Sequence, residues 1–95
     1  MAIAETKSAI VNDYGVLARQ AAYLVYHANK FHSEINLKSN GKTGNAKSMI
    51  GFMSMDLEKG DEVTIIADGL DAEEAVAKVK EIIDSFDDRI WWSNG

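Results

Sequence analysis

The chain has 95 residues, a formal net charge of −5 and no cysteine. Its length suits one domain over residues 1–95, and 46% hydrophobic residues are too many for a disordered chain. The acidic balance argues against general nucleic-acid binding, and the lack of cysteine excludes disulfides, thiolate metal sites and cysteine nucleophiles. Since neither a membrane span nor a signal peptide is recognisable, we expect a cytoplasmic protein. We also expect no cofactor.

The first third of the chain changes from strand to helix periodicity. Alternation over residues 4–11 predicts a strand, and residues 12–15 form a turn cluster. Apolar side chains then recur at helical spacing over residues 17–31, which predicts an amphipathic helix.

The middle of the chain predicts a β-hairpin, with strands at residues 34–39 and 42–45. Asn40-Gly41 fits the connecting turn, because both central positions of a type I′ turn need positive φ. Gly44 is expected to weaken the second strand or to mark a bulge.

The last half predicts two helices around a strand. Ser48 is expected to open a short helix reaching about residue 55, and residues 62–67 have the composition of a buried strand. Asp71 and Glu74 have the spacing of a capping box at the start of the longest helix. The apolar stripe of that helix comprises Ala75, Val76, Val79, Ile82, Ile83 and Phe86.

The resulting order is β-α-β-β-α-β-α. It predicts an α+β fold, a two-layer open-faced sandwich in which a four-stranded, mainly antiparallel sheet carries three helices on one face. An aromatic tail at about residues 88–95 follows the last helix.

Two segments, residues 15–21 and 45–54, resemble the HPr phosphocarrier family of the bacterial phosphotransferase system. The resemblance implies that Leu17 stands where the family has its phospho-accepting histidine. It also matches Arg19 to the arginine that holds the phosphoryl oxygens, and places Gln20 where proline is usual. Leucine has neither a lone pair nor a transferable proton, and near an N-cap it forgoes a side-chain acceptor at a cost of about 1 kcal/mol.

The segment around Ser48 resembles the regulatory serine segment of Gram-positive HPr proteins. The resemblance implies phosphorylation of Ser48 by an ATP-dependent HPr kinase and binding to a LacI-type catabolite control repressor. The alternative is that Ser48 is only an N-cap. The residues that the resemblance implies for partner binding are Leu17, Arg19, Gln20, Lys47, Met49, Ile50 and Met53.

We therefore expect a non-enzymatic HPr-like regulatory protein in the control of carbon catabolism, similar in logic to the catabolite-repression HPr-like proteins. One alternative is a degenerate or engineered phosphocarrier whose active histidine has been replaced. Another is an acylphosphatase-like hydrolase, which is disfavoured because no glycine-rich anion loop precedes Arg19.

Three other groups of residues carry expectations. His27 and His32 lie away from any predicted helix N-terminus, and their spacing predicts no metal site.

A basic patch beside Ser48, formed by Lys38, Lys42 and Lys47, would suit an acidic partner or a phosphate, the alternative being a mixed solvated surface.

Trp91 and Trp92, in the tail, should not stay in water. They are expected to fold back toward Leu17, to form a homodimer contact, or to pack on the chain's own sheet or helix.

Overall fold

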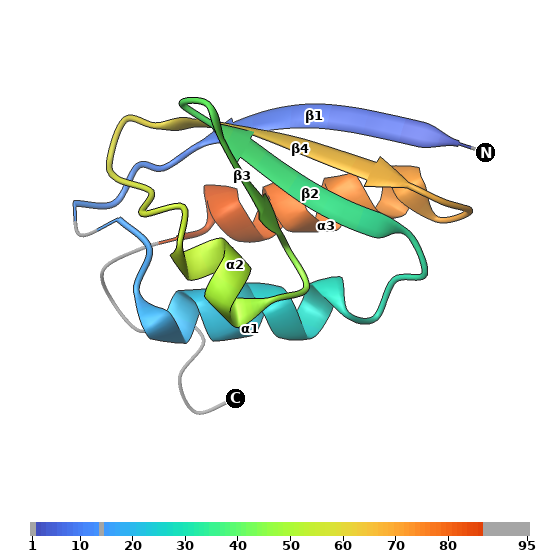
Figure 1. Cartoon of the computed structure of the whole chain (residues 1–95), viewed down its shortest axis with the longest axis horizontal. Coiled ribbons are helices and arrows are strands. Elements are labelled where there is room, and N and C mark those ends of the chain that lie inside the picture. Colours follow the sequence, from blue (N-terminus) through green and yellow to red (C-terminus); the bar gives the residue numbers. More distant parts are fainter. Residues whose placement is uncertain (1, 14, 87–95) are drawn as a thin grey trace.

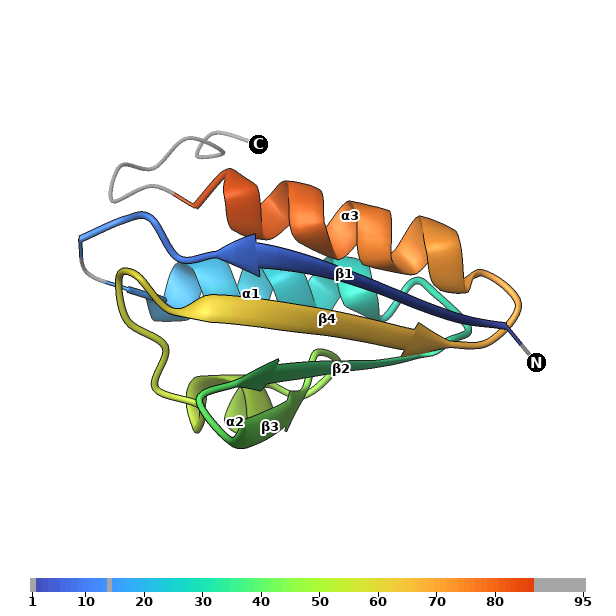
Figure 2. The same ribbon diagram turned by 90° about the horizontal axis from the view of Figure 1, so that it is seen from above.

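The computed structural model describes residues 2–13 and 15–86 and confirms the predicted architecture (Figure 1). The four strands form one antiparallel sheet in the order β1-β4-β2-β3, as Figure 2 shows from above. Three helices lie below the strands in Figure 1. The elements are β1 (Ile3–Ala9), α1 (Ala18–Ala28), β2 (Glu34–Ser39), β3 (Lys42–Asn45), α2 (Met49–Met53), β4 (Glu62–Asp68) and α3 (Ala72–Asp84).

The sheet buries alternate side chains against the helices, as a half-buried antiparallel sheet requires. Ile35 and Leu37 of β2 face the core, and so do Val63, Ile65 and Ala67 of β4. The six apolar residues of the predicted stripe are all buried, five of them on α3 and Phe86 just after its end. Among the described helices, none has the length and apolar character needed to cross a bilayer.

The hairpin between β2 and β3 turns as predicted, with φ of 53° at Asn40 and 79° at Gly41. The expectation of a bulge at Gly44 is wrong, because Gly44 pairs directly with Leu37 in an unbroken register. Glycine is needed there for packing: a Cβ would lie 2.7 Å from the Met55 sulfur and 2.8 Å from the Gly51 carbonyl oxygen. Gly44 therefore lets α2 approach β3.

The predicted capping box of α3 is also wrong, because the Asp71 side chain caps no amide of its own helix. Its carboxylate accepts hydrogen bonds from the backbone amides of His32 (2.8 Å) and Ser33 (2.9 Å) and from the Ser33 hydroxyl (2.6 Å). These donors, led by the Ser33 hydroxyl, lower the pKa of Asp71 to about 2. Asp71 thus fastens the start of α3 to the start of β2.

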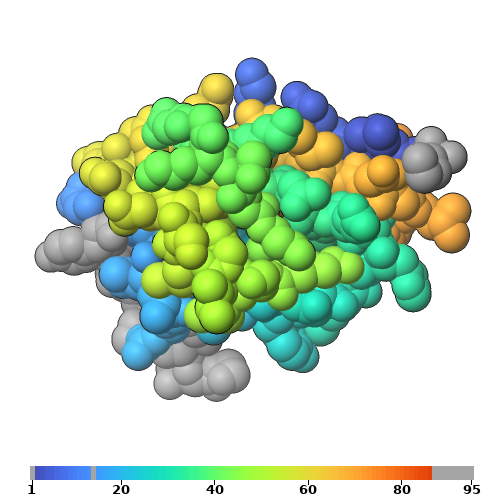
Figure 3. All heavy atoms as spheres, in the orientation of Figure 1, coloured from blue at the N-terminus to red at the C-terminus, as the bar shows by residue number. Residues whose placement is uncertain are grey.

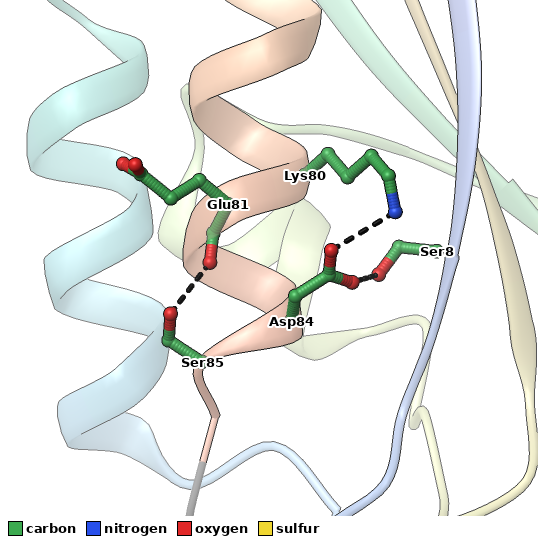
Figure 4. A network of polar contacts seen from close by, with 5 residues as sticks. All are labelled: Ser8, Lys80, Glu81, Asp84 and Ser85. Atoms are coloured by element: carbon green, nitrogen blue, oxygen red, sulfur yellow. Dashed lines mark hydrogen bonds and ion pairs between the residues drawn. The ribbon is translucent and has the colours of Figure 1, made fainter.

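A second polar network fastens β1 to the end of α3 (Figure 4). The Ser8 hydroxyl donates to one oxygen of Asp84, and the Lys80 ammonium lies 2.9 Å from the other. Burial acts to raise the pKa of Asp84, but the hydrogen bonds from Ser8 and Lys80 outweigh it, so the pKa is lowered. The Ser85 hydroxyl donates to the Glu81 carbonyl at 2.7 Å and closes the last turn of the helix.

Candidate functional site

The loop that enters α1 is held by backbone geometry. Gly15 has a φ of 67°, and a Cβ there would lie 2.5 Å from the Leu57 carbonyl oxygen. The Asn12 amide group donates to the Gly15 carbonyl. Because the loop is pinned on both sides, the start of α1 is placed against the segment that follows α2.

Leu17 is the N-cap of α1, with an extended backbone and a side chain that is 39% exposed. Its lack of a side-chain acceptor is partly offset, because the backbone amide of Leu17 donates to the Gln20 side-chain oxygen at 3.0 Å. This is one half of a capping box, in which the third helical residue reaches back to the N-cap amide. We did not predict this contact from the sequence, although a glutamine three residues after the N-cap is the signal that could have predicted it.

Arg19 and Gln20 have different surroundings within the first turn of α1. Arg19 is exposed, whereas Gln20 is only 3% exposed. Gln20 therefore contributes no contact surface, which corrects the expectation that it belongs to a partner-binding set. Its role is to fix the backbone of Leu17.

Ser48 is the N-cap of α2, as predicted, and its hydroxyl accepts a hydrogen bond from the Gly51 amide at 3.1 Å. The residue is half-buried. Phe52 is fully buried and anchors α2 to the core. The short helix thus presents Ser48 at one end while its core side stays fixed.

An apolar surface surrounds this serine on α2. Ile50 is 82% exposed, and Met49 and Met53 are also exposed. Helices α1 and α2 pack against each other, and Figure 3 shows the yellow-green atoms of α2 beside the blue first turns of α1 on one face. We call Leu17, Met49, Ile50 and Met53 the apolar face.

The three lysines have different surroundings. The Lys47 ammonium donates to the Phe31 carbonyl at 2.7 Å, and the Lys42 ammonium donates to the Met55 carbonyl at 3.3 Å. Lys38 and Lys42 both line a shallow groove at the β2–β3 hairpin, together with Glu62. The basic patch beside Ser48 stays a prediction.

Lys47 instead ties the two helices together. The Asn29 side chain, at the end of α1, donates to the Lys47 carbonyl at 3.1 Å, while Lys47 itself reaches Phe31. These two contacts join the C-terminal end of α1 to the residue before Ser48. The sequence held no local signal for this link, because the partners are 16 and 18 positions apart.

Neither histidine lies at the start of α1 or α2, whereas the backbone amide of His32 contacts Asp71 at the start of α3. His27 is in the last turn of α1, and its ring contacts those of Tyr23 (4.5 Å) and Tyr26 (5.2 Å) edge-on. Partial burial, followed by the charges of Lys78 and Lys30, lowers the pKa of His27. Within residues 2–13 and 15–86, no three histidine, aspartate or glutamate side chains are grouped to hold a metal ion. Trp91 and Trp92 lie outside the described residues.

The open-faced sandwich thus presents the N-caps of α1 and α2 together with one apolar face. The family described as PTS-HPr, PTS HPr component phosphorylation site, matches residues 4–85. The chain therefore belongs to the HPr family, whose members are phosphocarrier proteins and not themselves catalysts.

Solved structures of this family superpose closely on the chain. The phosphocarrier protein HPr of Bacillus anthracis str. Ames is 38% identical with a TM-score of 0.80, over 86% of this chain and 98% of that one. The histidine-containing phosphocarrier protein of a Mycoplasma is 39% identical with a TM-score of 0.81, over 84% and 91%. Crh of Bacillus subtilis, a catabolite repression protein described as a domain-swapped dimer, is 44% identical with a TM-score of 0.69, over 75% and 82%.

Proposed function

We propose that this chain is a non-enzymatic regulatory member of the HPr family, which acts in the cytoplasm by binding other proteins. Leu17 would occupy the phospho-accepting position, so the chain would not relay phosphate through histidine. Phosphorylation of Ser48 would switch its binding in the control of carbon catabolism. The observation that carries the proposal is the pairing of an unreactive N-cap on α1 with a serine N-cap on α2.

The place of Leu17 supports the first part. A helix N-terminus favours an anion through its free amides and its dipole, so it suits a phosphorylated side chain. Leu17 stands there and has no group that accepts a phosphoryl. His27 lies at the opposite end of α1, where the dipole disfavours an anion, so it is poorly placed to act as a substitute.

The surroundings of Ser48 support the second part. Phosphorylation adds a charge of about −1.5 to −2 at pH 7. That charge would enter beside the exposed side chains of Met49 and Ile50 and would change how this surface binds. Because Phe52 anchors the helix from the other side, the modification would alter the surface more than the fold.

The proposed partners are an HPr kinase and a LacI-type catabolite control repressor. The apolar face suits them because methionine side chains adapt to different partner surfaces. The chain is similar to Crh, whose description concerns catabolite repression, and this similarity supports the repressor as a partner. Arg19 is exposed at the border of this face and would contribute a charged contact. Lys47 would act by holding Ser48 in place.

The test is incubation with an HPr kinase and ATP, followed by intact-mass and peptide mass spectrometry. We expect one added phosphoryl group on Ser48 and none in Ser48→Ala. Ser54→Ala is the matched control, because Ser54 caps the other end of the same helix. No phosphate on Ser48 would remove the switch, and a phosphoryl group on His27 or His32 that passes to a sugar-uptake component would refute the proposal as a whole.

The competing function is a degenerate or engineered phosphocarrier. Leu17→His combined with Gln20→Pro, supplied with phosphoenolpyruvate and Enzyme I, would accept and pass on phosphate if only the reactive residue had been lost. Such relay would show a retained carrier surface, whereas Ser48-dependent repressor binding by the unmodified chain favours the regulatory function.

We also propose that Trp91 and Trp92 contribute a homodimer contact. Sedimentation of the whole chain and of a chain ending at residue 87 would test this. A loss of association without a loss of thermal stability supports the contact, and a monomer in both cases excludes it.

A further inference from the structure

The Gln20 side chain is a buried polar group aimed at the start of its own helix. Its oxygen lies 3.0 Å from the Leu17 amide nitrogen, and only 3% of the residue is exposed. No acidic residue stands in the first turn of α1. The amide oxygen of Gln20 is therefore the side-chain acceptor at this helix start.

The Leu17 amide is one of the four amides at this helix start that an anion could use. The first amides of a helix lack intrahelical partners and point toward a bound anion. A carboxamide oxygen carries partial negative charge, so it both occupies the Leu17 amide and repels a second negatively charged oxygen. If the Gln20 side chain moved away, the Leu17 amide would lose its acceptor and a buried side chain would have to be displaced.

The backbone before Leu17 leaves little room for an alternative arrangement. Gly15 lies against the Leu57 carbonyl, and the Asn12 side chain holds the Gly15 carbonyl. The loop cannot retreat to open a second approach to the helix start without breaking these contacts.

We propose that Gln20 is a specificity-determining residue, which disfavours an anion at the N-terminus of α1 and would do so even if Leu17 were replaced by histidine. This inference rests on the proposed function, in which position 17 corresponds to the phospho-acceptor. Gln20 acts through the Leu17 amide, so it is a positioning residue and takes part in no chemical step.

The experiment compares three proteins: Leu17→His alone, with Gln20→Met, and with Gln20→Glu. Methionine matches glutamine in length but lacks the amide oxygen, whereas glutamate keeps an oxygen and adds a charge. With phosphoenolpyruvate and Enzyme I as the phosphoryl source, we expect the methionine protein to be phosphorylated fastest and the glutamate protein slowest. The step from glutamine to glutamate should be about two- to fivefold, the effect of a charge near a helix N-terminus, and the step from methionine to glutamine, which changes no formal charge, should be smaller.

Thermal stability should follow the opposite order, which separates an effect on anion binding from a merely structural role. Loss of the acceptor in Gln20→Met should lower the melting temperature by roughly 4–8 °C, while Gln20→Glu should retain it. If Gln20 only supported the fold, the less stable methionine protein would be the slower acceptor.

Two outcomes of the phosphorylation experiment would overturn the inference, and they differ in what else they refute. Equal phosphorylation rates in all three proteins would refute the role of Gln20 and leave the proposed function standing. No phosphorylation in any of them would refute the assignment of position 17, and with it both proposals. Hydrogen exchange in the natural Leu17 background adds a check: Gln20→Met should speed exchange of the Leu17 amide, and unchanged exchange would also refute the inference.

Discussion

Replacing Gly44 with alanine should push α2 off the sheet. The added Cβ would lie 2.7 Å from the Met55 sulfur and 2.8 Å from the Gly51 carbonyl oxygen, so each neighbour must move by roughly 0.7 Å to reach ordinary contact. Overpacking of this kind costs about 1–3 kcal/mol. Alanine recovers about 0.4–1 kcal/mol by restricting the unfolded chain. The net loss should be about 1–2 kcal/mol.

Urea unfolding followed by circular dichroism measures this loss, with Thr43→Ser on the same strand as the control. A double-mutant cycle with Met55→Ala then isolates the cause. Shortening Met55 removes the sulfur contact but leaves the Gly51 oxygen, so the two changes should be less than additive by at least about 0.5 kcal/mol. Unchanged stability of Gly44→Ala, or strict additivity in the cycle, would show that close packing does not explain this glycine.

Three further predictions concern the core, a helix cap and a carboxylate. Phe52→Ala should lower the free energy of unfolding by about 3–5 kcal/mol in urea titrations, because Phe52 is the fully buried residue of α2; a loss under 1 kcal/mol would contradict the packing. Ser48→Ala should lower it by about 1 kcal/mol through the lost cap, and Ser48→Asp should restore most of that loss in the same titrations. The pKa of Asp71 is lowered to about 2 in the folded chain, so its contribution is present above the unfolded pKa and is lost as the pH falls from about 4 to about 2. Thermal melts across that range should show a shallower pH dependence in Asp71→Asn, and identical slopes would exclude this carboxylate as the cause.

The helix boundaries show where local patterns reach their limit. Periodicity located α1 within the predicted residues 17–31, but the helix runs only from Ala18 to Ala28. The Asn29 side chain folds back onto the Val25 carbonyl at 2.8 Å and ends it. Apolar spacing continues to Phe31, which packs on the core from outside the helix. The apolar spacing indicates which side chains are buried, and a buried side chain such as Phe31 need not lie in a helix.

The sequence by itself determined the class of fold, the β2–β3 turn, the buried stripe of α3 and the serine cap of α2. Each of these depends on residues within a few positions of one another, where chain geometry leaves few options. Tertiary structure decided which partner each polar side chain takes. Asp71 binds Ser33 across 38 positions instead of capping its own helix, and Lys47 binds the Phe31 carbonyl 16 positions away. Such choices depend on which donors and acceptors packing brings within about 3 Å, and spacing along the chain does not encode that distance.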